Sequence, residues 1–267
     1  MAQTYGNQLW GGEEVAHERC ELAERTITDV SKFFTSRQQI EEKYAKQLSS
    51  ITSKTKTEGG SIGVGWQSIR DQQNHQLATN YEHFVSQLSG EILVPIEAVR
   101  KQHFNDKSRL SNDMAQLKKE ISRREAALND KKTHYYKMCE VHEREKKKHD
   151  ECSNNPSYPA AKLTKLQASL AKAKQDMDSS ADQYREGVAD YNNFKHKSEE
   201  ATRALLNEYQ EVDLRRLEAM RDVLKAYIHH IDESASRFLQ FCSACKDQLL
   251  AVSPQKDMQG ISDNRHF

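Results

Sequence analysis

The 267-residue sequence is poor in helix-breaking residues and poor in the apolar residues that build a large core. It has four prolines and ten glycines, and 36% of its residues are hydrophobic against 30% charged. Globular domains have about 45–50% apolar residues, whereas charged chains with few glycines and prolines and a helical periodicity form long helices and coiled coils. The composition therefore disfavours a compact α/β enzyme.

Long hydrophobic runs and a disulfide framework are also missing. No window approaches the about 18 consecutive apolar residues of a transmembrane helix, and Met1 to Trp10 lacks the basic end and apolar run of a signal peptide. The five cysteines are an odd number scattered among helix formers, which is typical of free thiols in a reducing compartment; they are Cys20, Cys139, Cys152, Cys242 and Cys245. We expect a cytosolic chain, or one on the cytosolic side of a membrane.

Sequence motifs of common catalytic sites are absent as well. There is no G-x-x-x-x-G-K-[ST], H-E-x-x-H or G-x-S-x-G. Cys242 and Cys245 form a CxxC without a second pair at zinc spacing, which favours packing over metal or redox chemistry. His229 and His230 are adjacent, and side chains at adjacent helical positions point about 100° apart, so we expect one packed and one solvated imidazole rather than a shared metal. No enzyme, cofactor or metal site is predicted.

Turn-forming residues are concentrated in two segments. Glu58 to Gly65 contains four glycines and is predicted to be a turn, and Ser153 to Pro159 contains two prolines and two asparagines. From about Trp66 to Cys152 only Pro95 interrupts a helical pattern. This predicts one kinked helix roughly 130 Å long.

Apolar residues recur every three or four positions in three long segments, and in the first segment the stripe consists of Val30, Phe33, Arg37, Ile40, Tyr44, Leu48 and Ile51. We predict an all-α fold: an elongated bundle of three long helices with a short N-terminal segment and a polar C-terminal tail. Few apolar residues occur from about Lys131 to Cys152, so a two-helix tip with little core is expected there. The wide stripes leave apolar surface uncovered, which predicts an antiparallel homodimer with six helices at its centre.

The net charge of zero hides a segregation of charge along the chain. Residues 100–149 contain 15 Lys/Arg against 8 Asp/Glu. Salt screens charges over roughly 8 Å, so local charge decides what the middle of the chain attracts. The alternative is that these charges are the solvated face of a long helix, paired with glutamates three or four residues away. Aromatic residues lie on the apolar stripes and the isoelectric point is about 7.2, so no nucleic-acid partner is expected.

The stretch from Phe33 to Leu48 carries the pattern F-x-x-x-R-x-x-I-E-x-x-Y-A-K-x-L. It resembles the FCH segment that opens F-BAR domains. Leu9-Trp10 before it, Arg100-Lys101 after a proline, and Glu211 to Leu217 resemble the rest of that domain in the same order, so the resemblance spans nearly the whole chain.

The resemblance implies an F-BAR domain over residues 1–252, with an FCH segment at about 5–57, a helical hairpin at about 65–250 and a tip loop at 153–159. Residues 253–267 are expected to form a flexible tail or the start of a linker. The implied dimer is curved and binds anionic phospholipids, including phosphoinositides, through its concave surface. By motif position, the implied lipid-binding residues are Lys54, Lys56, Arg100, Lys101, Lys107 and Arg109, with an outer set of Lys131, Lys132 and Lys165.

The implied function is membrane binding that senses or generates curvature and links the membrane to the actin cytoskeleton in endocytosis or cytokinesis. We expect the chain at the cell cortex, peripheral on the cytosolic face of the plasma membrane. Actin regulators would be recruited by modules outside this chain, which ends at Phe267. The sequence leaves undecided whether dimers assemble laterally into oligomers. The alternative function is a coiled-coil dimerisation scaffold that binds only proteins.

Overall fold

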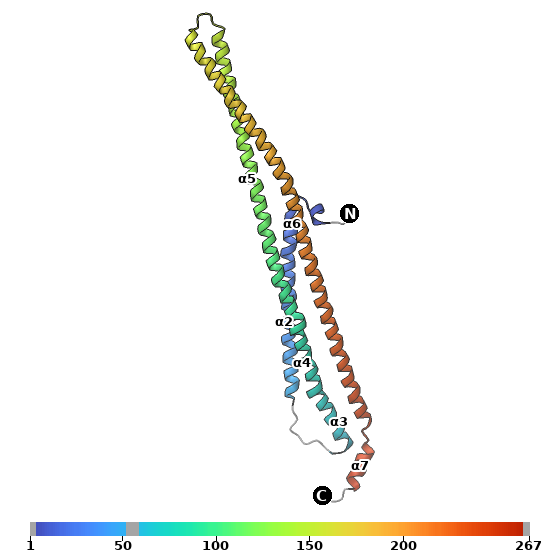
Figure 1. Cartoon of the computed structure of the whole chain (residues 1–267). Helices are drawn as coiled ribbons and strands as arrows, with labels where there is room; N and C mark the ends of the chain where they lie inside the picture. The colour runs from blue at the N-terminus through green and yellow to red at the C-terminus, as the bar shows by residue number, and fades with distance from the viewer. Residues whose placement is uncertain (1–3, 52–58, 264–267) are drawn as a thin grey trace. The chain divides into compact units, whose positions relative to one another are not determined.

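The computed structural model describes residues 4–51 and 59–263, and these residues form helices and no strand. In chain order the elements are α1 (Tyr5–Gln8), α2 (Glu13–Ser50), α3 (Gly60–Asp71), η1 (Gln72–Leu77), α4 (Ala78–Gln87), η2 (Leu88–Leu93), α5 (Val94–Ser153), α6 (Ala160–Leu250) and α7 (Pro254–Asp263) (Figure 1). The elements η1 and η2 are π-helical turns. The predicted all-α class with three long helical segments is confirmed.

The chain divides into two compact units, which are described separately. The first unit comprises Met1–Ala16 with Ser108–Gln210, and the second comprises His17–Lys107 with Glu211–Phe267. Helices α5 and α6 contribute residues to both units. The domain boundaries expected from the sequence stay a prediction.

In the first unit, α5 and α6 lie side by side and are joined by the loop that follows Ser153 (Figure 1). At the end of this unit opposite the loop, Leu110 and Leu206 are fully buried. The Tyr5 backbone N–H of α1 donates a hydrogen bond of 2.8 Å to Gln210 Oε1 of α6. Residues 115–172 are all described and none of them is buried. The expected two-helix tip with little core is confirmed.

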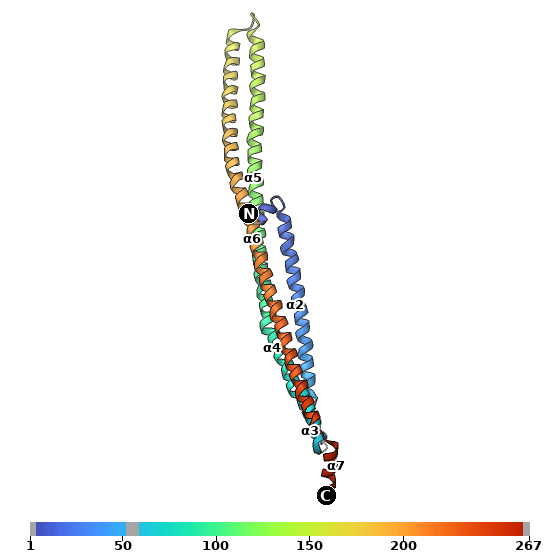
Figure 2. The ribbon, with the colours of Figure 1, turned by 90° about the vertical axis from the view of Figure 1, so that its right-hand side faces the viewer.

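In the second unit, α2 lies beside α4 and α6 (Figure 2). The main apolar core is formed by side chains from α2, α4, η2, α5 and α6: Ile27, Phe34, Phe84, Leu88, Ile92, Ile96, Met220 and Val223. The ring of Phe34 meets the ring of Tyr227 edge to face at 4.7 Å.

Helix α2 has two apolar faces, and the apolar stripe predicted from the sequence contains residues of both. The face that packs inside the unit contains Ile27, Phe34 and Ala45, all buried. Phe33 and Ile40, which lie on the predicted stripe, are 58% and 62% exposed. A helix with apolar residues on both sides can bury only one of them within its own chain, so the second face is left uncovered.

The stretch from Trp66 to Cys152 was expected to be a single helix kinked at Pro95. It is helical throughout, but two π-helical turns interrupt the α-helical pattern, and the second ends at Leu93, two residues before Pro95. Proline has no backbone donor and its ring clashes with the carbonyl one turn earlier, and a wider π turn relieves that clash. The irregularity therefore lies before the proline rather than at it.

The glycine-rich segment is mostly helix, not the turn that its composition predicted. Helix α3 begins at Gly60, which has a φ of +86°. Gly65 is buried in the helix, and a Cβ atom there would lie 3.0 Å from Val252 Cγ2. Glycine is needed at 60 for its backbone conformation and at 65 for the close approach of the segment after α6.

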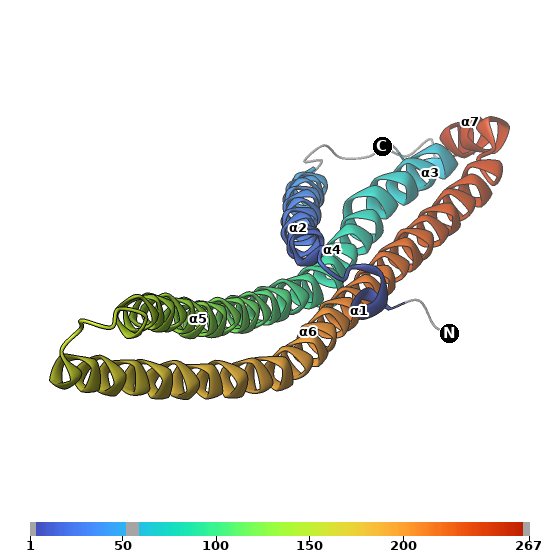
Figure 3. The same ribbon diagram turned by 90° about the horizontal axis from the view of Figure 1, so that it is seen from above.

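Of the segment 253–267, which was expected to be a flexible tail or the start of a linker, residues Pro254–Asp263 form helix α7, which lies beside α3 (Figure 3). The carboxylate of Asp257 accepts hydrogen bonds from the Ser61 backbone N–H (2.7 Å), the Ser61 hydroxyl (2.7 Å) and the Ile62 backbone N–H (3.1 Å). These bonds satisfy N–H groups in the first turn of α3, so Asp257 caps that helix from a distance of almost 200 residues in sequence. They also hold the pKa of Asp257 below its ordinary value.

Candidate functional site

The basic residues predicted to bind lipid are distributed along α5 and at the start of α6. Lys54 and Lys56 lie outside the described residues. Arg100, Lys101 and Lys107 belong to the second unit, and Arg109, Lys131, Lys132 and Lys165 to the first. The structure separates these residues into cations that are paired within the chain and cations that are not.

Three residues of the inner set are paired with carboxylates. Arg100 donates two hydrogen bonds to Glu97, of 2.8 and 2.6 Å, and these bonds hold the pKa of the Glu97 carboxyl below its ordinary value. Lys107 forms an ion pair with Glu24 of α2, and its side chain is only 18% exposed. Lys107 therefore fastens α5 to α2 and is poorly placed to reach a phosphate.

Arg109 bridges the two helices of the first unit. Its Nη1 lies 2.8 Å from Glu208 Oε2 on α6 and 3.6 Å from Asp113 Oδ2 on its own helix. Two carboxylates surround this one guanidinium, so the site presents no local excess of positive charge. The position expected from the family motif is occupied here by a structural ion pair.

The other predicted residues are exposed and make no ion pair with any described residue. These are Lys101, Lys131, Lys132 and Lys165. The ammonium group of Lys132 lies 5.9 Å from the ring centroid of Tyr136, one turn further along α5. The residues expected to form the weaker, outer set are therefore those whose charge is most available.

The same division holds over all of residues 100–149, every one of which is described. Its five arginines are all paired with carboxylates, for example Arg123 and Arg124 with Glu120. Hydrogen bonds from Arg123 and then Arg124 lower the pKa of Glu120 to about 2. Seven lysines in the range make no ion pair and are exposed. With Lys165 they form what we call the free lysine set: Lys101, Lys119, Lys131, Lys132, Lys137, Lys146, Lys147 and Lys165.

The difference between the two residue types has a chemical cause. The guanidinium group is planar and offers paired donors that match a carboxylate three or four residues away, whereas the ammonium group is a strongly hydrated point charge on a flexible stem. The expectation of pairing with a glutamate three or four residues away is thus correct for Arg100, Arg123 and Arg124 and incorrect for the free lysine set. Arg109 pairs most closely with Glu208 of α6, and Arg144 pairs with the adjacent Glu145. Sequence reasoning had not singled out Lys137, whose only signal was its place in the positive segment.

Among the described residues, no helix is both long enough and apolar enough to cross a membrane.

Comparison with known proteins identifies the fold to which this surface belongs. Residues 12–80 match the family model FCH, described as the Fes/CIP4 and EFC/F-BAR homology domain. The structure matches the Imp2 F-BAR domain with a TM-score of 0.86 and 17% identity, over 99% of this chain and 89% of that one. It matches the Hof1p F-BAR domain with a TM-score of 0.89 and 13% identity, over 99% and 98%.

The sequence also resembles the GTPase activating protein homolog 1 of Dictyostelium discoideum, with 25% identity over 98% of this chain and 28% of that protein. The chain spans between 28% and 58% of the length of the first curated relatives that it matches. All of these similarities point to one architecture.

The chain therefore has the F-BAR fold, and its residues 12–80 match the FCH family model. F-BAR domains form dimers and bind membranes peripherally, as modules associated with membrane curvature, and they are structural adaptors rather than enzymes.

Proposed function

We propose that this domain binds anionic phospholipids, phosphoinositides among them, through the free lysine set. The observation that carries the proposal is the division of the positive segment into paired arginines and unpaired, exposed lysines. Each Lys or Arg near an anionic leaflet contributes roughly 1 kcal/mol to binding. Eight such lysines per chain, and twice as many in a dimer, are enough for avid binding without an inserted apolar segment.

The same proposal assigns a structural role to three residues of the predicted lipid-binding set. Arg100, Lys107 and Arg109 are each bonded to a carboxylate, and Lys107 is also largely covered. Moving such a cation to a lipid phosphate would leave its partner carboxylate unpaired next to an anionic surface, which offsets the gain. Among the described residues of the inner set, Lys101 is the one that we retain for membrane contact, and Lys54 and Lys56 stay predictions.

Dimer formation is proposed on the uncovered apolar faces of α2 and α6. Phe33 and Ile40 of α2 are exposed, and so are Leu217, Leu224 and Ile228 of α6. Leu217, Leu224 and Ile228 also line a groove of about 640 Å³ with Ile27 and Val30. A second copy of the chain presenting the same surface in reverse would remove this apolar area from water.

We further propose that the domain acts at the cell cortex, on the cytosolic face of the plasma membrane, and couples membrane shape to actin in endocytosis or cytokinesis. Two observations support this proposal: the chain spans only part of the length of its relatives, and one of these is named as a GTPase activating protein. Modules of that kind, located elsewhere in a longer protein, would recruit the actin regulators. Lateral assembly of dimers would follow membrane binding.

The test is co-sedimentation with vesicles of phosphatidylcholine alone, of phosphatidylcholine with phosphatidylserine, and of the latter with a phosphoinositide. We expect binding only to the anionic vesicles, falling steeply between low and high salt because exposed charges are screened. The competing function, a scaffold that binds only proteins, predicts a dimer that stays in the supernatant with all three. That result would exclude the proposal.

A further inference from the structure

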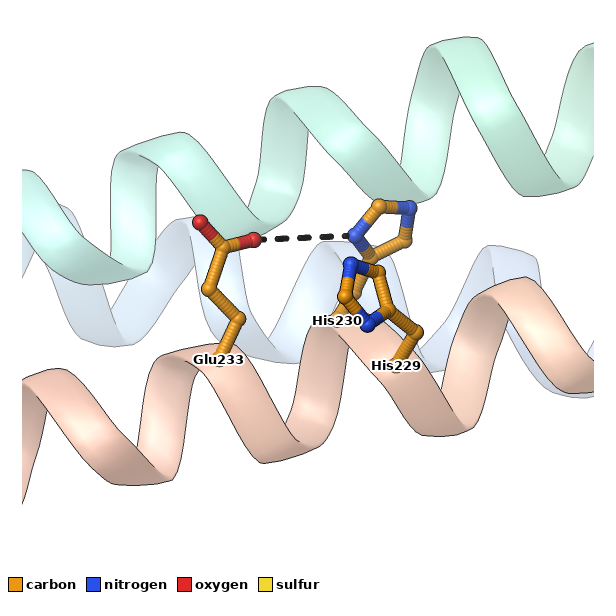
Figure 4. Close-up of side chains that lie close together, drawn as sticks. All are labelled: His229, His230 and Glu233. Carbon is orange, nitrogen blue, oxygen red and sulfur yellow. Dashed lines mark ion pairs between the residues drawn. The ribbon is translucent and has the colours of Figure 1, made fainter.

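A second cluster of chemically active side chains lies in the second unit and takes no part in the lysine surface. His229, His230 and Glu233 of α6 point toward one another (Figure 4), and one ligand atom from each lies within 4.8 Å of the other two. Residues 229 and 233 are four apart and 230 and 233 are three apart, so all three lie on neighbouring positions of one helix surface. The sequence predicted one packed and one solvated imidazole rather than a shared metal, and His230 is indeed buried while His229 is exposed.

His230 is the buried member, with 4% of its surface exposed. Its Nε2 lies 3.0 Å from Glu91 Oε2, a residue of η2. A carboxylate only accepts hydrogen bonds, so Nε2 carries the hydrogen and the neutral ring has its lone pair on Nδ1. That Nδ1 is buried and has no hydrogen-bond partner among the described residues.

The bare Nδ1 of His230 faces the carboxylate of Glu233, at 3.9 Å from Oε2. This separation is too long for a hydrogen bond. A buried nitrogen lone pair directed at a carboxylate oxygen is unfavourable with nothing between them, because both are acceptors. An electron-pair acceptor placed between the two atoms would satisfy both.

The carboxylate of Glu233 is itself held in place. Arg237 donates to Oε1 at 2.6 Å and Gln87 of α4 donates to Oε2 at 3.0 Å. Each carboxylate oxygen has two lone pairs, so Oε2 retains one that is directed toward His230. The arrangement of a histidine oriented by one carboxylate through its far nitrogen, with its near nitrogen free, is that of histidines which ligate metals.

From these contacts we propose that His229, His230 and Glu233 bind a first-row divalent transition metal of the zinc type. Two imidazole nitrogens and a carboxylate oxygen suit such a cation, and a solvent molecule would complete a tetrahedron. Ligand atoms around tetrahedral zinc are about 3.4 Å apart. The cluster therefore has to close by about 1 Å, and the exposed ring of His229 is the side chain free to move. Glu91, Gln87 and Arg237 act as positioning residues.

Zn²⁺ titrated into the full chain by calorimetry tests the proposal, with Co²⁺ absorption as a spectroscopic readout of nitrogen and oxygen ligands. We expect one site per chain. His229→Ala removes an exposed ligand, so circular dichroism stays unchanged while affinity falls at least tenfold. Glu91→Ala removes only the orienting carboxylate and should lower affinity by about tenfold to hundredfold.

The chain supplies a matched control on the same helix. His196 and Glu200 of α6 are also four residues apart, with His196 Nδ1 3.6 Å from Glu200 Oε1, but both are exposed and no buried histidine completes the group. His196→Ala should leave the affinity and the stoichiometry unchanged.

Three outcomes would overturn the proposal. The first is an absence of stoichiometric Zn²⁺ binding. The second is binding that His196→Ala weakens as much as His229→Ala, which would indicate scattered surface histidines. The third is a thiolate-to-cobalt charge-transfer band, which would place the metal on cysteine. The vesicle assay reads a different surface, so its result and this one are independent.

Discussion

Two isoleucines separate the core of one chain from the surface that we assign to the dimer. Ile92 of η2 is fully buried within the chain, whereas Ile40 of α2 is 62% exposed. Replacing each by alanine removes the same atoms. Ile92→Ala should therefore create a cavity inside the second unit, and Ile40→Ala should act only where a second copy covers α2.

The magnitudes follow from these environments. Truncation of a buried isoleucine to alanine costs about 2–5 kcal/mol, and in a chain of this size each kcal/mol lowers Tm by roughly 2–4 °C, so Ile92→Ala should lower Tm by about 4–20 °C. Ile40→Ala removes three carbon atoms from each of the two copies, worth at most about 2.4 kcal/mol per copy. The homodimer therefore loses at most about 4.8 kcal/mol, which is a roughly 3,000-fold rise in its dissociation constant.

Thermal unfolding followed by circular dichroism measures the first effect, and sedimentation equilibrium over a dilution series measures the second. Ile92→Ala should lower Tm at every protein concentration. Ile40→Ala should raise the dimer dissociation constant and leave the Tm of the dilute monomer nearly unchanged. The reasoning would be refuted by an Ile40→Ala dimer as tight as the parent, or by an Ile92→Ala chain as stable as the parent.

Two further predictions concern the Asp257 cap on α3 and the cysteine thiols of the second unit. Hydrogen bonds depress the folded-state pKa of Asp257, so the cap that it forms on α3 is fully present at neutral pH and is lost as pH falls through that lowered pKa, below about 4. The protection of the Ser61 amide, taken relative to its intrinsic exchange rate at each pH, should fall there, and Asp257→Asn should lower it at neutral pH. Protection that neither change alters would contradict the cap. Burial, with a smaller contribution from Asp213, raises the pKa of the Cys20 thiol to about 11, so mass spectrometry after alkylation of the native chain at pH 8 should find Cys20 unmodified and the exposed Cys242 labelled.

Local sequence signals were sufficient for the hairpin and its tip. Two prolines and two asparagines between Ser153 and Pro159 end α5 at Ser153 and prevent α6 from beginning before Ala160. The scarcity of apolar residues from about Lys131 to Cys152 predicted the thin tip. These features depend on neighbours in sequence, which is why they were predictable. The glycine-rich segment was wrongly predicted to be a turn, because Gly65 lies in a helix where the absence of a side chain lets Val252 approach closely. No local sequence pattern reveals that contact.

The site was less predictable because it depends on partners that are distant in sequence. Lys107 and Arg109 carry the charge that the family motif requires, but Glu24 and Glu208, 83 and 99 residues away, neutralise them. The stripe on α2 failed for a related reason: periodicity marks an apolar position without saying whether its own chain or a second copy covers it. Only the folded structure shows that Phe34 is buried and that the adjacent Phe33 is exposed.

The most direct test of the central claim compares two double variants in binding to phosphatidylserine vesicles. Lys131→Gln/Lys132→Gln removes two members of the free lysine set, whereas Arg109→Gln/Glu208→Gln removes an ion pair and leaves the net charge unchanged. At roughly 1 kcal/mol per lysine, the first should bind about thirty-fold more weakly per chain, and the second should bind like the parent. Equal binding by both variants would contradict the claim that unpaired lysines attach this domain to membranes.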